Sequence, residues 1–102
     1  MAMAVTLCAS EAIGEGAGLH FKVGERDVAV FRRAGRLFAL DGLCPHEGAL
    51  LGHGEVVGHQ VVCDRHGWAF DLATGQCEQY PNEVVARFPV REQDGMVIVE
   101  LP

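Results

Sequence analysis

The sequence predicts an all-β fold, and three observations support this prediction. Thirteen glycines divide the chain into short segments. No segment keeps an apolar period of about 3.6 residues for long enough to form a helix. The segments between turns are rich in β-branched and aromatic residues, as strands are. Short strands separated by regularly spaced turns are typical of a β-sandwich or small barrel, so we expect an antiparallel sandwich or small barrel with Greek-key-like pairing.

The expected strands are bounded by turn residues and lie at residues 5–9, 19–23, 26–33, 36–41, 55–57, 60–63, 69–71, 86–91 and 96–101. Tight hairpin turns are expected at Ala34-Gly35 and Gly58-His59, and Asp94-Gly95 lies in the turn between the last two strands. Residues 42–54 and 64–68 interrupt this pattern and are expected to form loops. Loops held by a rigid sheet often carry function, so candidate functional residues are sought there.

Composition and charge limit the possible functions. A chain of 102 residues is long enough for a single domain, covering residues 1–102. Its net charge of -6 disfavours nucleic acid and anionic lipid as partners. No apolar run approaches the roughly 18 residues of a membrane span. The first ten residues do not resemble a secretory signal. We therefore expect a cytoplasmic protein with protein partners, whose four cysteines are metal ligands or buried thiols rather than disulfides.

Two short motifs combine cysteine with histidine. They are Cys44-Pro45-His46 and Cys63-Asp64-Arg65-His66, one in each expected loop. A single zinc ion could use the same four ligands, although zinc modules commonly pair two cysteines on one knuckle. One cysteine and one histidine per loop favour a binuclear iron-sulfur cluster, with both thiolates on one iron and both imidazoles on the other. The formal charges of two ferric ions, two sulfides and two thiolates then cancel.

The sequence resembles the Rieske iron-sulfur family over nearly the whole chain. The resemblance rests on residues 43–49 (LCPHEGA) and 63–75 (CDRHGWAFDLATG), together with residues 88–91, 94–95 and 97–101 near the C-terminus. It implies a Rieske-type antiparallel β-sandwich in which loops build a cluster-binding subdomain at about residues 42–83. It also implies one Rieske-type 2Fe-2S cluster, bound by Cys44, His46, Cys63 and His66, with the histidines at an exposed tip.

The chain departs from the usual family pattern at two places. Asp64 stands where the second loop usually has proline, which removes rigidity and adds a carboxylate. Residues 80–83 are the candidate for the family's third, cluster-shielding loop, but Tyr80 replaces the usual glycine before its proline.

Four further positions distinguish the chain from respiratory members of the family. Ala49 and Arg65 occupy the places where those members have a disulfide, and Trp68 and Phe70 replace hydroxyl side chains that hydrogen-bond to cluster sulfurs. Fewer donors stabilise the reduced cluster less, so we expect a reduction potential toward the low end of the roughly -150 to +300 mV Rieske range.

The nearest match by size and motif is the Rieske-type ferredoxin of bacterial ring-hydroxylating dioxygenase systems. The resemblance implies a monomeric electron carrier, not itself an enzyme, between a flavin-dependent ferredoxin reductase and a terminal Rieske oxygenase. An alternative is the small subunit of an assimilatory nitrite reductase, which residues 70–75 also resemble. A third hypothesis for the function is a structural zinc module or a pure interaction module.

The remaining reactive residues have simpler interpretations. Cys8 and Cys77 are expected to be structural thiols, and Trp68 is expected to pack beneath the cluster. The histidines outside the motifs, His20, His53 and His59, are expected to be structural or exposed. Glu47 and Asp64 could either steer a basic partner or be solvated charges.

Overall fold

The structure is a computed structural model that describes residues 2–45, 48–65 and 67–102. Its strands are β1 (Met3–Ala9), β2 (Gly18–Val23), β3 (Arg26–Arg33), β4 (Arg36–Asp41), β5 (Glu55–Val57), β6 (Gln60–Val62), β7 (Ala69–Asp71), β8 (Arg87–Phe88), β9 (Val90–Gln93) and β10 (Met96–Leu101). Two short 3₁₀ turns, η1 (Ser10–Ala12) and η2 (Leu51–His53), are the helical elements among the described residues.

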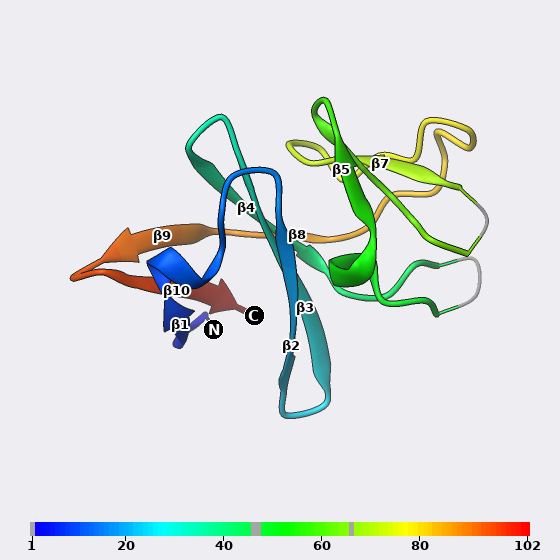
Figure 1. The fold of residues 1–102 in the computed structure, drawn as a ribbon. Helices are drawn as coiled ribbons and strands as arrows, with labels where there is room; N and C mark the ends of the chain where they lie inside the picture. Colours follow the sequence, from blue (N-terminus) through cyan, green and yellow to red (C-terminus); the bar gives the residue numbers. More distant parts are fainter. Residues whose placement is uncertain (1, 46–47, 66) are drawn as a thin grey trace.

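The strands form three antiparallel sheets. Their orders are β1-β10-β9, β2-β3-β4-β8 and β5-β6-β7. Figure 1 shows the first sheet on the left, the β2-β3-β4-β8 sheet in the centre and the third sheet on the right. The all-β antiparallel prediction is therefore confirmed, and the third sheet falls within residues 42–83. The division of the chain into a domain and a cluster-binding subdomain stays a prediction.

Most predicted strands match the structure closely, but the strand predicted at residues 86–91 is wrong. The structure divides it into β8, which pairs with β4, and β9, which pairs with β10. Pro89 lies between them and has no backbone N–H for a continuous ladder. Its carbonyl accepts a hydrogen bond from the Glu100 N–H at 2.9 Å. The chain thus passes from one sheet to another at a proline. The strand predicted at residues 60–63 ends one residue earlier, before Cys63.

In two of the predicted hairpin turns, Ala34-Gly35 and Asp94-Gly95, both residues have positive φ. Ala34 and Gly35 have φ of 55° and 75°, and Asp94 and Gly95 have φ of 53° and 76°. Two successive residues with positive φ match the twist of the flanking strands. A further turn, which was not predicted, lies at Gly24, which has φ of 61° and joins β2 to β3.

The central strand β3 contributes to two hydrophobic cores. Val28 and Val30 pack in one core with side chains of β10, whereas Ala29 and Phe31 pack in the other. This division follows the alternation of side chains along a strand. All four side chains are fully buried. The second core also contains both cysteines of the predicted ligand motifs.

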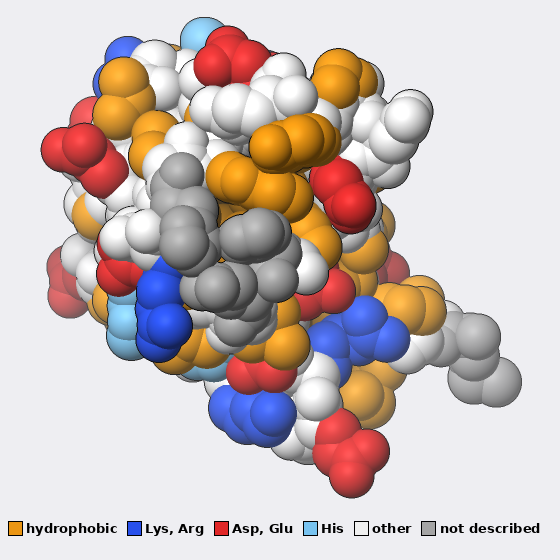
Figure 2. Space-filling model, turned by 90° about the vertical axis from the view of Figure 1, so that its right-hand side faces the viewer, with side chains coloured by type: hydrophobic (Ala, Val, Ile, Leu, Met, Phe, Trp, Pro, Cys, Tyr) orange, Lys and Arg blue, Asp and Glu red, His pale blue; other side chains and the backbone are white. Residues whose placement is uncertain are grey.

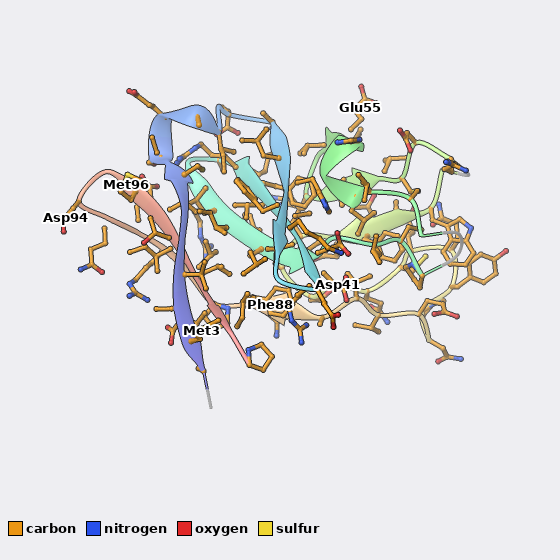
Figure 3. All side chains as sticks on the ribbon, turned by 90° about the horizontal axis from the view of Figure 1, so that it is seen from below. Met3, Asp41, Glu55, Phe88, Asp94 and Met96 are labelled. Atoms are coloured by element: carbon orange, nitrogen blue, oxygen red, sulfur yellow. The ribbon has the colours of Figure 1, made fainter. Side chains whose placement is uncertain are left out.

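The β9-β10 hairpin and the β5-β6-β7 sheet lie at opposite ends of the molecule. Figure 3 shows Asp94 and Met96 at the tip of the β9-β10 hairpin, far from Glu55 at the start of β5. The β9-β10 hairpin tip is thus remote from the sheet that carries the second predicted ligand loop. Within the described ranges, no helix is long and apolar enough to span a membrane.

One polar network joins η1, directly after β1, to β3 and β9. The Arg32 guanidinium donates to the Ser10 carbonyl at 3.0 Å and to the Glu92 carboxylate at 3.0 Å. The Ser10 hydroxyl donates to the other Glu92 oxygen. These hydrogen bonds, that of Ser10 first and then that of Arg32, lower the pKa of Glu92 below its ordinary value of 4.5. The network therefore favours the ionised carboxylate.

Candidate metal centre

The first predicted ligand loop, residues 44–49, is a closed hairpin loop. An isolated bridge between Leu43 and Leu50 closes its base. Within it, the Cys44 N–H donates to the Ala49 carbonyl, and the Gly48 N–H donates back to the Cys44 carbonyl, both at 2.8 Å. Gly48 has φ of 69°, a conformation that favours glycine. Cys44 is thus fixed at the first position of the loop.

The second predicted ligand loop, residues 63–68, has the same internal construction. Pairing between Val62 and Ala69 closes its base. The Cys63 N–H donates to the Trp68 carbonyl at 2.8 Å, and the Gly67 N–H donates to the Cys63 carbonyl at 3.1 Å. Gly67 has φ of 72°. Each loop therefore has a cysteine at its start and a left-handed glycine four residues later. That four-residue spacing is visible in the sequence.

The two loop cysteines are buried in the same hydrophobic core. Cys44 and Cys63 are each 2% exposed and belong to the same core cluster, which includes Leu51 and Phe70. Two buried thiols at equivalent places in similar loops suit the soft ligand set of an iron-sulfur cluster, because metal coordination stabilises thiolates that burial would otherwise disfavour. The donor chemistry of the described part of the site therefore fits this cofactor.

The two predicted histidine ligands, His46 and His66, lie outside the described residues, as does Glu47. In the part of the chain that is described, no group of three or more histidine, cysteine, aspartate or glutamate side chains could hold a metal ion. The structure thus brings together the two cysteines of the predicted set, and the histidines stay a prediction. Asp64 and Arg65, between the two ligands of the second loop, are exposed.

A third segment, residues 76–84, lies against β7 and the second loop. Phe70 forms an isolated bridge with Cys77, and the Glu78 N–H donates to the Ala69 carbonyl at 2.8 Å. Farther along, the rings of Tyr80 and Trp68 have centroids 4.5 Å apart and planes inclined by 38°. The loop predicted at residues 80–83 therefore contacts the second ligand loop through an aromatic pair. Figure 2 shows hydrophobic side chains gathered on the face where these loops end.

The other reactive residues lie elsewhere or take part in packing. Cys77 is fully buried in the core, and burial raises the pKa of the half-buried Cys8 thiol on β1. His20 places Nε2 3.0 Å from the Asp27 carboxylate, and its ring centroid is 6.3 Å from that of the exposed His53. His59 is exposed in the β5-β6 turn. Trp68 is partly buried and packs against the core that contains both cysteines.

Comparison with known proteins identifies the family. The sequence pattern of the Rieske 2Fe-2S domain matches residues 3–89, which is most of the chain. This chain belongs to the Rieske family. Its cofactor is accordingly one Rieske-type 2Fe-2S cluster.

Two Rieske relatives resemble the chain over almost its whole length. The ferredoxin component of the alkene monooxygenase system of Xanthobacter autotrophicus is 32% identical over 96 residues, which cover 93% of this chain and 79% of the relative. The ferredoxin component of the p-cumate 2,3-dioxygenase system of Pseudomonas putida is 33% identical over 100 residues, covering 95% and 85%. Both relatives are ferredoxin components of oxygenase systems.

Two solved Rieske structures share the fold. A candidate NADH-dependent nitrite reductase small subunit from Mycobacterium tuberculosis superposes with a TM-score of 0.91 at 25% identity, covering 100% of this chain and 97% of that one. A chain in the complex of reduced oxygenase and oxidised ferredoxin of carbazole 1,9a-dioxygenase superposes with a TM-score of 0.84 at 30% identity, covering 94% and 91%. The fold is thus common to both classes of protein that the sequence suggests.

Proposed function

We propose that this Rieske protein carries single electrons from a flavin-dependent ferredoxin reductase to a terminal oxygenase. In this proposal Cys44 and Cys63 bind the inner iron of the cluster, and His46 and His66 bind the outer iron. The bound cluster supplies a centre that gains and loses one electron. The chain itself catalyses no turnover and acts as one component of an oxygenase system.

The observation that carries the ligand proposal is the matched construction of the two loops. In both, the cysteine N–H bonds to the residue five positions later, and the cysteine carbonyl accepts from the glycine four positions later. The two thiols are therefore presented alike from one core. Matching loops suit a binuclear cluster in which each loop supplies one ligand to each iron.

The role of the protein residues is to hold the ligands and keep water from the inner side of the cluster. Phe70, Leu51 and Cys77 are each fully buried in the same core as Cys44 and Cys63. An apolar core beneath the thiolates lowers the local dielectric and limits access to the sulfur atoms. The outer side of the cluster would then be covered only by the ligand loops, and a protein partner could approach it there.

The choice of an oxygenase as electron acceptor rests on the relatives. Ferredoxin components of two oxygenase systems match at least 93% of this chain. A ferredoxin with a similar fold is found in complex with an oxygenase. The reductase as donor follows from the resemblance to such ferredoxins.

A specific observation also supports the second candidate function. The nitrite reductase small subunit superposes over the full length of this chain. In that role the chain would serve a sirohaem-containing catalytic subunit. The intact set of cysteine and histidine ligands favours the electron carrier, because many nitrite reductase small subunits lack these residues.

Stopped-flow electron transfer distinguishes the two candidates. The reduced protein is mixed anaerobically with a terminal Rieske oxygenase or with a sirohaem nitrite reductase subunit, and reoxidation is followed by the visible absorbance of the cluster. We expect rapid reoxidation by the oxygenase. Reoxidation only by the sirohaem subunit would contradict the proposal.

The ligand set is tested by serine substitution of cysteine. Cys63→Ser should abolish the cluster, because a hydroxyl is a poor ligand for iron in this setting. Cys8→Ser is the matched control, since Cys8 lies on β1 outside the core that contains the loop cysteines. Retention of a normal cluster in Cys63→Ser, measured by iron and sulfide content, would refute the assignment.

A further inference from the structure

A glutamine side chain bonds directly to the backbone of the second ligand loop. The Gln79 Oε1 accepts a hydrogen bond from the Ala69 N–H at 2.9 Å, and its Nε2 donates to the Gly67 carbonyl at 3.3 Å. The same Oε1 lies 3.6 Å from the Cys77 Sγ, which donates to it. One amide group thus bonds to the residues on both sides of Trp68.

The backbone of residues 77–78 pairs with β7 as far as the Ala69 carbonyl, and the Ala69 N–H and the Gly67 carbonyl bond to the Gln79 side chain instead. The Ala69 carbonyl accepts from the Glu78 N–H, so residues 77–78 run beside the start of β7. Gln79 follows directly, and its side chain continues the pairing to Ala69 and Gly67. Ala69 is only 4% exposed, so its N–H needs a protein partner or an ordered water. The glutamine amide meets that need.

Tyr80, the residue after Gln79, contacts the same part of the loop through its aromatic ring. The Tyr80 and Trp68 ring centroids are 4.5 Å apart, close enough for a favourable aromatic pair. Trp68 also approaches Phe70 of the core, with centroids 6.5 Å apart. Trp68 is therefore held at its flanking backbone by Gln79 and on its ring by Tyr80.

The second loop gains rigidity from this external support. Asp64, directly after Cys63, lacks the fixed backbone φ that a proline would supply at that position. The described hydrogen bonds within the loop join Cys63 to Trp68 and to Gly67. Gln79 anchors the end of the loop that contains both of these partners.

We propose that Gln79 is a positioning residue for the cluster, acting through the backbone of residues 67–69, and that Tyr80 supports it by packing on Trp68. This inference rests on the proposed ligand set, in which the second loop carries Cys63 and His66. Loss of the amide would allow the loop to take several arrangements. The iron ligands would then be held in a distribution of geometries, and the cluster would dissociate more readily.

The test compares variants of the cluster-loaded protein. Gln79→Met keeps the length and unbranched shape of the side chain but removes the oxygen and nitrogen that bond to the loop. Gln60→Met is the matched control, because the Gln60 amide donates to the exposed Glu78 carboxylate at 3.1 Å and makes no hydrogen bond to the described residues of the loop, 63–65 and 67–68. Tyr80→Phe retains the ring, whereas Tyr80→Ala removes it.

Two measurements are made on each variant. The first is the rate of cluster loss to an iron chelator, followed by visible absorbance. The second is the line width of the electron paramagnetic resonance signal of the dithionite-reduced cluster, which reports the spread of ligand geometries. We expect Gln79→Met to lose its cluster about fivefold faster, the change that corresponds to one net hydrogen bond, with broadened lines. Gln60→Met and Tyr80→Phe should match the wild type, and Tyr80→Ala should also lose its cluster faster.

The outcomes separate this inference from the proposed function. Wild-type line width and loss rate in Gln79→Met would overturn the positioning role, as would an equal effect of Gln60→Met. Faster cluster loss in Gln79→Met without line broadening would show that Gln79 is merely structural and also overturn the proposal. A wild-type spectrum that lacks nitrogen ligation would instead overturn the ligand set.

Discussion

Gly75 tests how the two ends of the third segment are held together, through the close approach of residues 75 and 85. It has φ of +79°, and a Cβ placed on it would lie 2.2 Å from the Val85 carbonyl oxygen. Its own N–H donates to the Asp71 carbonyl at 2.7 Å, and its carbonyl accepts from the Val85 N–H at 2.9 Å. Gly75→Ala would therefore strain the backbone and also push residues 75 and 85 apart.

The structure allows the two effects to be separated. Forcing alanine into the left-handed region costs about 1 to 2 kcal/mol. Displacing Val85 should break its hydrogen bond to Gly75, which adds about 1 kcal/mol. Gly95→Ala is the matched control, because Gly95 has φ of +76° but no atom of the described residues lies within 4 Å of its ideal Cβ. Gly75→Ala should therefore be more destabilising than Gly95→Ala by about 1 kcal/mol or more.

Urea unfolding followed by circular dichroism, with both variants at equal cluster content, measures the two free energies. Thermal unfolding offers a second measurement, since about 1 kcal/mol lowers the midpoint of a domain of this size by about 4 to 8 °C. Equal destabilisation of the two variants, to within about 0.5 kcal/mol, would refute the argument that close approach of Val85 makes Gly75 special.

Three further predictions concern acid stability, the core and the cofactor. The pKa of Glu92 is lowered by its Ser10 and Arg32 hydrogen bonds, so its stabilising effect is present above the ordinary pKa of 4.5 and is lost as the pH falls through the lowered value. The unfolding free energies of wild type and Glu92→Gln, measured by urea unfolding, should therefore differ less at about pH 3 than at about pH 7; an equal difference at both would contradict the assignment. Phe70→Ala should cost about 3 to 5 kcal/mol in urea unfolding, because Phe70 is fully buried beneath the loops, and a cost near zero would contradict its core position. Removing the cluster with a reductant and chelator should lower the calorimetric melting temperature, because the cofactor stabilises the folded state that binds it, and an unchanged value would contradict that coupling.

The fold could largely be predicted because local signals agree with it. The central strands at residues 26–33 and 36–41 have the predicted bounds, and the Ala34-Gly35 turn between them takes the expected backbone. The exchange of sheets at Pro89 was missed, because the strand-like pattern of residues 86–91 was given more weight than the proline that interrupts it. The sequence pattern does not show that β8 and β9 pair with different strands.

The site could be predicted only in part. The two cysteine-histidine motifs pointed to the loops, and both cysteines lie in one buried cluster. Gln79 was missed because its role depends on a fold contact with residues 67 and 69, and a single glutamine has no distinctive sequence signal. The Cys-to-Gly spacing shared by Gly48 and Gly67 was present in the sequence and could have revealed the matched loops.

The central claim is that one cluster is bound by two cysteines and two histidines. It is tested most directly by electron paramagnetic resonance of the dithionite-reduced protein. We predict a rhombic signal with the low average g value of nitrogen-ligated iron, unchanged in Cys8→Ser and absent from Cys63→Ser. A silent spectrum, or the higher average g value of a cluster held by four cysteines, would contradict the account.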